Sequence, residues 1–152
     1  LKISDLVIHD RSVLFSSNNN EFFSLDINTG FINWQQKVNT YIRPAIVNDL
    51  IFTVTLEGFL VIIDNPTGNM VRVTDVFDQF KLKKRNAIKP VGFSISEKDI
   101  FLSTNHGKLL IIDILNGKTK SVLKIDKSKI SSPFFSNNNL YLIKENSIIR
   151  LN

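Results

Sequence analysis

The sequence predicts an all-β protein, and three observations support this prediction. Short apolar runs rich in β-branched and aromatic residues recur along the 152 residues, as at Leu50–Val54 and Phe59–Ile63. Such residues favour strands, and turn-forming Asn, Asp and Gly bound each run. No stretch of 12 or more residues shows the i, i+3, i+4, i+7 apolar spacing of an amphipathic helix. Finally, a strand-like run ends three times in the same pattern, Asp-x-x-(Thr/Asn)-Gly.

This pattern marks an internal repeat. Its three copies are Asp26–Gly30, Asp64–Gly68 and Asp113–Gly117. A proline opens each later repeat, at Pro44, Pro90 and Pro133. Each repeat has room for four short strands joined by polar turns. Four-stranded units of about 40 residues are typical of β-propeller blades.

The repeats predict one partial β-propeller domain over residues 1–152, built from antiparallel blades. The expected blades span residues 2–38, 39–80, 88–125 and 130–152. We expect four strands in each blade, with the outermost strand missing from the last. About four blades are therefore expected to form the C-terminal half of a larger, eight-bladed ring.

The repeated Asp and Gly residues are predicted to have structural roles. An Asp carboxylate at the end of a strand can accept hydrogen bonds from backbone N–H groups two or three residues later. Gly supplies the positive φ that closes the turn. A calcium loop would need further oxygen ligands and a distal Glu, which the three copies lack.

Composition excludes several kinds of chemistry. The chain has no Cys, which excludes thiolate metal sites and a cysteine nucleophile, and it has only two His residues. Both His9 and His106 lie next to predicted turns, and we interpret them as turn residues. The sequence therefore predicts no catalytic residue, no metal ligand and no cofactor-binding residue. No apolar run is long enough to cross a bilayer.

The basic run from Lys81 to Lys89 is the most distinctive local feature. It is either a solvated connection between repeats or a protein-binding surface, on which Phe77 and Phe80 would anchor a partner. We expect Asp75–Phe80, which precedes it, to form a short helical turn. Nucleic-acid binding is not predicted, because the net charge of +5 is modest and no aromatic residue interrupts the run. The predicted partner-binding residues are Tyr41, Arg43, Lys83, Lys84 and Arg85.

Residues 24–34, with Asp26, Gly30 and Trp34, resemble the Ala-x-Asp-x-x-Thr-Gly-x-x-x-Trp motif of quinoprotein-like (PQQ-type) propeller repeats. The resemblance implies that Trp34 packs between neighbouring blades. Arg72 and Ser121 stand where the later repeats would carry this Trp.

One branch of this family assists outer-membrane β-barrel assembly, and the segment Ser132–Asn152 is similar to the end of its propeller lipoprotein. The resemblance implies a non-enzymatic scaffold in the periplasm, attached to the outer membrane through a lipid on an N-terminal Cys outside this sequence. Its implied partner is the pore subunit of the barrel-assembly machine. The alternative is a quinone (PQQ)-dependent dehydrogenase, whose family members hold a calcium or lanthanide ion with carboxylates and tend to carry paired Cys residues.

Overall fold

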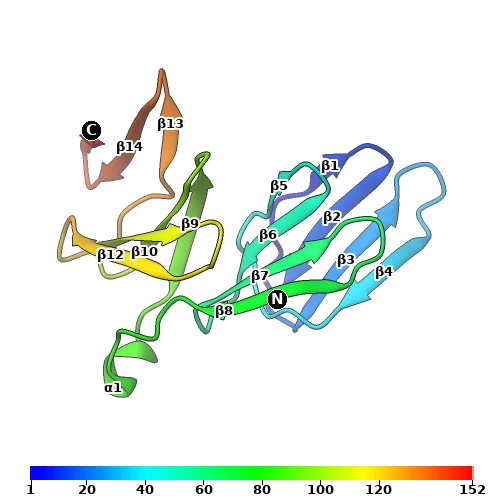
Figure 1. The fold of residues 1–152 in the computed structure, drawn as a ribbon, viewed down its shortest axis with the longest axis horizontal. Coiled ribbons are helices and arrows are strands. Elements are labelled where there is room, and N and C mark those ends of the chain that lie inside the picture. Colours follow the sequence, from blue (N-terminus) through cyan, green and yellow to red (C-terminus); the bar gives the residue numbers. More distant parts are fainter. Residues whose placement is uncertain (152) are drawn as a thin grey trace. The chain divides into compact units, whose positions relative to one another are not determined.

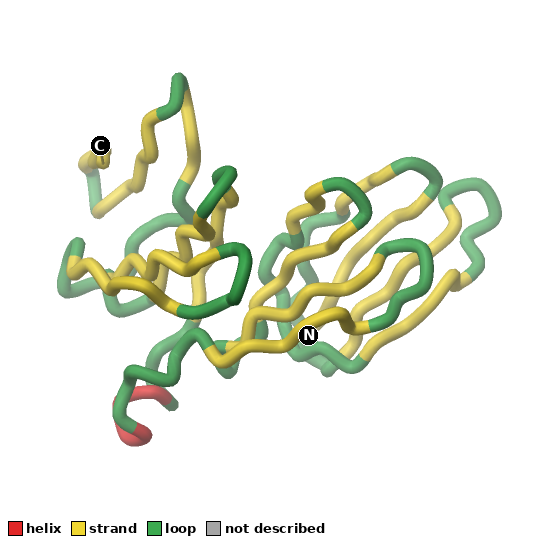
Figure 2. The backbone as a smooth tube through the Cα atoms, viewed as in Figure 1, coloured by secondary structure: helices red, strands yellow, loops and turns green. Residues whose placement is uncertain are grey.

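The computed structural model describes residues 1–151, in which fifteen strands form four antiparallel sheets and one short helix is present (Figure 1). The predicted all-β class is confirmed. No helix in these residues is long and apolar enough to span a membrane. The tube in Figure 2 shows how little of the chain is helical.

In every sheet, strands that follow one another in the sequence are neighbours. The first sheet comprises β1 (Val7–His9), β2 (Ser12–Ser17), β3 (Glu21–Asp26) and β4 (Ile32–Gln36). The second comprises β5 (Ala45–Val47), β6 (Leu50–Val54), β7 (Phe59–Asp64) and β8 (Met70–Asp75). The third comprises β9 (Pro90–Ile95), β10 (Asp99–Thr104), β11 (Lys108–Asp113) and β12 (Thr119–Lys124). The fourth has three strands among the described residues, β13 (Phe134–Ser136), β14 (Asn139–Lys144) and β15 (Ser147–Leu151).

The chain divides into two compact units, residues 1–74 and residues 75–152. In the first unit, one apolar cluster joins the first two sheets, with Leu14 and Phe22 from one and Ile51 and Ile63 from the other. In the second unit, Leu109 of β11 packs in a cluster with Leu140 and Leu142 of β14. Each unit therefore buries the faces of two successive sheets against a core of its own.

The repeated Asp turns have nearly the same hydrogen bonds in all three copies. In the first, the Asp26 carboxylate accepts the N–H groups of Asn28 and Thr29 at 2.9 and 3.0 Å. The N–H of Gly30 donates to the Asp26 carbonyl at 2.8 Å, and Gly30 has a φ of +74°. The pKa of the Asp26 carboxyl lies below its ordinary value, chiefly because the Thr29 N–H stabilises the ionised form, with smaller contributions from the Asn28 N–H and from Arg11.

The third copy shows why Asn can replace Thr. In the first two turns, the Thr29 and Thr67 hydroxyls accept the backbone N–H two residues later, both at 3.2 Å. In the third, Asn116 Oδ1 accepts the N–H of Lys118 at 2.8 Å. In all three turns this position thus supplies a hydrogen-bond acceptor, which is a hydroxyl in two copies and an amide oxygen in the third.

Trp34 on β4 connects the first sheet to the second. Its indole Nε1 donates to the carbonyl of Asn65 at 2.7 Å, and its ring stacks on Phe22 with 5.8 Å between ring centroids. The ring lies so close to Gly68 that a Cβ there would overlap the indole. Trp34 thus lies against the Asp64–Gly68 turn of the next repeat.

The helical segment differs from the prediction. Residues 76–80 form turns, and the helix α1 (Leu82–Arg85) falls on the basic run instead. Val76 and Phe77 are fully buried, and burying both holds this stretch in a turn. Leu, Lys and Arg are also better helix formers than Val, Phe or Asp.

We expect Gly68→Ala to destabilise the protein more than Gly30→Ala. Both glycines have nearly the same positive φ, +75° and +74°, so both substitutions carry the backbone strain of about 1 kcal/mol. Only at Gly68 would the new methyl group overlap Trp34, since nothing lies within 4 Å of a Cβ at Gly30. The additional loss should be about 1–3 kcal/mol. Urea denaturation of both variants measures the difference, and equal losses would contradict the packing described for Trp34.

We expect the stabilising effect of the Asp26 charge to depend on pH. A carboxyl whose pKa is lowered by folding stabilises the folded state above its unfolded pKa, and this stabilisation is lost as the pH falls through the folded pKa. Asp26→Asn should therefore lower the free energy of unfolding at pH 7 and have a smaller effect near pH 3. Denaturation of both proteins at the two pH values tests this, and a deficit that does not shrink in acid would contradict it.

Candidate protein-binding surface

The structure places the five predicted partner-binding residues on two separate segments. Tyr41 and Arg43 precede β5 in residues 1–74, whereas Lys83, Lys84 and Arg85 lie in α1 in residues 75–152. The role of these five residues in partner binding stays a prediction.

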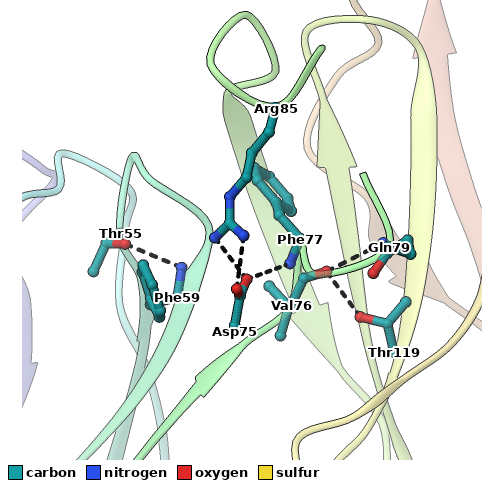
Figure 3. A network of polar contacts seen from close by, with 8 residues as sticks. All are labelled: Thr55, Phe59, Asp75, Val76, Phe77, Gln79, Arg85 and Thr119. Atoms are coloured by element: carbon teal, nitrogen blue, oxygen red, sulfur yellow. Dashed lines mark hydrogen bonds and ion pairs between the residues drawn. The ribbon is translucent and has the colours of Figure 1, made fainter. Parts of the chain in front are cut away.

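The segment from Asp75 to Lys89 connects β8 to β9, and we call it the connector. Figure 3 shows the polar contacts that hold its first part. The Asp75 carboxylate accepts hydrogen bonds from both terminal nitrogens of Arg85, each at 2.7 Å, and from the N–H of Phe77 at 3.0 Å. This two-point pairing fixes the end of α1 to the end of β8.

Further hydrogen bonds and the packing of Phe77 also hold the connector. The carbonyl of Val76 accepts the Thr119 hydroxyl at 2.9 Å and the Gln79 side-chain amide at 3.2 Å (Figure 3). The Phe77 side chain is fully buried and meets Phe80 edge to face, with 5.4 Å between ring centroids. Phe77 therefore belongs to the interior of its own chain, which corrects the expectation that it anchors a partner.

Asn105, in the turn between β10 and β11, holds the second part of the connector. Its side-chain oxygen accepts the N–H of Lys89 at 2.8 Å, and its side-chain amide donates to the carbonyl of Ala87 at 3.1 Å. Ile88 between them is buried. The connector is thus fixed on both sides of α1, so a partner that binds here would meet a preformed surface.

The helix α1 and the residue before it combine an exposed apolar side chain with three exposed lysines. The Leu82 side chain is 78% exposed, and Lys81, Lys83 and Lys84 are exposed around it. Within residues 1–151, none of these three lysines makes an ion pair. Arg85 differs from them, since its side chain is only 19% exposed and pairs with Asp75. An exposed leucine among unpaired lysines is suited to an acidic partner that offers an apolar contact.

Charge is divided unevenly between the two units. Residues 1–74 carry five Lys and Arg against seven Asp and Glu, whereas residues 75–152 carry fourteen against seven. The whole positive excess of the chain therefore lies in the unit that contains α1. The division favours an acidic partner for this unit.

The segment that holds Tyr41 and Arg43 is fixed by the residue between them. Ile42 is buried, and its N–H donates to the Thr40 hydroxyl at 3.0 Å. Tyr41 is half-buried under Lys2, whose Nζ lies 5.1 Å from the ring centroid. Arg43 is exposed and lies 3.8 Å from the Asp5 carboxylate, a long and solvated ion pair that a partner could replace at little cost.

The two histidines differ in their surroundings. His106 is exposed in the turn between β10 and β11. His9 lies 3.5 Å from the Asp10 carboxylate and 3.6 Å from that of Asp49, so three possible metal ligands meet there. Sequence spacing does not group His9 with Asp49, although both lie at the turn after the first strand of consecutive repeats.

The comparisons with known proteins agree with the repeat structure. Residues 2–74 match the model of the family described as outer membrane protein assembly factor BamB. No curated protein matches the sequence.

Three solved structures illustrate the similarity in fold. BamB from Moraxella catarrhalis matches with a TM-score of 0.76 and 14% identity, over 97% of this chain and 41% of that chain. The β-propeller domain of Myceliophteria thermophila Cps50 (Swd1) matches with a TM-score of 0.68 and 14% identity, over 92% and 48% of the two chains. The computationally designed Ika4 protein matches with a TM-score of 0.74 and 13% identity, over 98% of this chain and 89% of that chain. The predicted propeller fold is confirmed, and the chain spans well under half the length of that BamB chain.

We expect Arg85→Ala to loosen the connector, because it leaves the Asp75 carboxylate without its paired guanidinium. The loss in stability should be about 1.5–3 kcal/mol, the range for hydrogen bonds to charged groups. Cleavage at Lys81, Lys83 and Lys84 by a lysine-specific endoprotease should become faster, and this protease does not use the altered arginine. Arg43→Ala serves as a control, since its ion pair is long and exposed. Equal cleavage of both variants would contradict a fixing role for Arg85.

Proposed function

We propose that this chain, which is built from propeller repeats of the PQQ-like, BamB-like family, is a non-enzymatic scaffold that binds other proteins during outer-membrane β-barrel assembly. The observation that carries the proposal is the fixed connector, which presents Leu82 and three unpaired lysines on a rigid base. The family match over residues 2–74 supports barrel assembly as the process.

The proposed partner is the pore subunit of the barrel-assembly machine, and acidic residues around an apolar pocket on that subunit would meet α1. We propose Lys83 and Lys84, together with Leu82, as its main contacts, and Tyr41 and Arg43 as a second contact region. Arg85 contributes by holding α1 in place. The proposed location is the periplasm, on a lipid anchor at the outer membrane.

The experiment measures binding of the full-length protein to the purified pore subunit, after co-purification from gently solubilised membranes. A charge-reversal variant, Lys83→Glu/Lys84→Glu, and Leu82→Ser test the proposed contacts. Lys98→Glu/Lys118→Glu is the matched control, because both lysines are exposed in the same unit at the turns on the opposite ends of the strands.

We expect near-equal recovery of the pore subunit with the wild-type protein. The charge-reversal variant should bind it about tenfold or more weakly, which corresponds to about 1.4 kcal/mol. The control should bind as the wild type does. The double variant Tyr41→Ala/Arg43→Ala measures how much the second contact region contributes to binding of the pore subunit.

Two outcomes would contradict the proposal. Equal binding by the charge-reversal variant and the control would show that α1 is not the contact. Absence of the pore subunit from the purified material, with dye reduction that requires added quinone and calcium, would instead favour the dehydrogenase alternative.

A further inference from the structure

We propose that His9, Asp10 and Asp49 bind one divalent transition-metal ion, Zn²⁺ in the first instance. His9 ends β1 and Asp10 follows it in the turn to β2, whereas Asp49 lies in the turn between β5 and β6. The three residues thus bring two hairpins of neighbouring sheets, both within residues 1–74, to one point.

The distances suit a single ion. His9 Nε2 lies 3.5 Å from Asp10 Oδ2 and 3.6 Å from Asp49 Oδ1, and one ligand atom from each residue lies within 4.8 Å of the others. Ligand atoms about 2.0–2.2 Å from a tetrahedral zinc ion are themselves about 3.4 Å apart. An ion could therefore enter after small side-chain adjustments, with water as a fourth ligand.

One imidazole and two carboxylates favour zinc over calcium and magnesium. One imidazole nitrogen with two carboxylate oxygens is a donor set that zinc accepts. Calcium and magnesium prefer oxygen ligands alone and gain little from an imidazole. The chain has no Cys, so no thiolate competes for the ion, and its other histidine is the exposed His106 in the other unit.

The repeat architecture does not by itself require these side chains. The equivalent turns of the third and fourth sheets carry Glu97 and Lys98 in one and Asn137 and Asn138 in the other, with no histidine. Backbone geometry explains only part of the first two turns, where Asp10 and Asn48 adopt positive φ values of 52° and 55°. A positive φ at Asp10 or Asn48 does not by itself place the His9 side chain near two carboxylates. The His9 side chain is 29% exposed, so an ion could reach it from solvent.

A bound ion would cross-link the hairpin turns of two successive blades. This role differs from the proposed protein binding and does not depend on it. Because only the folded state holds the three ligands together, zinc should raise the stability of the folded state by mass action.

The experiment titrates ZnCl₂ into the full-length protein, purified without a histidine tag, and reads both zinc binding by calorimetry and the melting temperature. His9→Gln and Asp49→Asn remove one ligand each, and His106→Gln is the matched control. Circular dichroism establishes that each variant is folded before titration. CaCl₂ and MgCl₂ are titrated in parallel.

We expect the wild type and His106→Gln to bind zinc at the same site. Introducing His9→Gln into either protein should remove this site. Zinc at about a hundredfold excess over Kd should raise the melting temperature by about 5–10 °C in proteins that keep His9. Asp49→Asn should bind zinc about tenfold or more weakly, since even outer-shell partners contribute that much. Calcium and magnesium should give no such shift.

The proposal is overturned if His9→Gln binds zinc and gains stability as the wild type does. It is equally overturned if zinc neither binds nor shifts the wild-type melting temperature, since the three residues would then form only an ion pair. Equal responses to zinc and calcium would also overturn it, because the imidazole would have no part in binding.

Discussion

The fold of the first unit depends on one packing constraint, which is that the central strands β6 and β7 bury both of their faces. In β6, the consecutive residues Ile51, Phe52, Thr53 and Val54 are all buried. Side chains that follow one another in a strand point to opposite faces of the sheet. The central strands of this sheet must therefore be covered on both faces by other parts of the protein. Trp34 contributes to this packing, because it lies between the first sheet and the Asp64–Gly68 turn of the second repeat.

The sequence predicted those parts of the structure that are determined locally. Strands, their order within a sheet and the Asp-x-x-(Thr/Asn)-Gly turns follow from side chains within a few residues of one another. Pairings between distant residues were not predictable in the same way. The basic run makes Arg85 a candidate for partner binding, but it does not reveal that Asp75, ten residues earlier, pairs with its side chain. The burial of Phe77 was also not predictable, since composition does not reveal which aromatic residue faces inward.

The connector is a structured loop that does not belong to a sheet. Its polar contacts involve Asp75, Thr119 on β12 and Asn105 in the turn between β10 and β11, so three separate contacts within residues 75–152 fix it. The surface at Leu82 is therefore rigid, and its binding would not require ordering of a flexible segment. The same argument does not extend to Lys83 and Lys84, whose side chains remain free to adjust to the shape of a partner.

The uneven division of charge affects how fast a partner arrives as well as how tightly it binds. A net excess of seven positive charges in residues 75–152 attracts an acidic protein before any contact forms. This attraction acts over roughly 8 Å at physiological ionic strength and fades as salt is added. Association with such a partner would therefore slow at high salt, while the dissociation rate, governed by short-range contacts at Leu82, would change little. In the proposed binding mode, charge would control how often the partner is encountered, and the exposed leucine would control how long it stays bound.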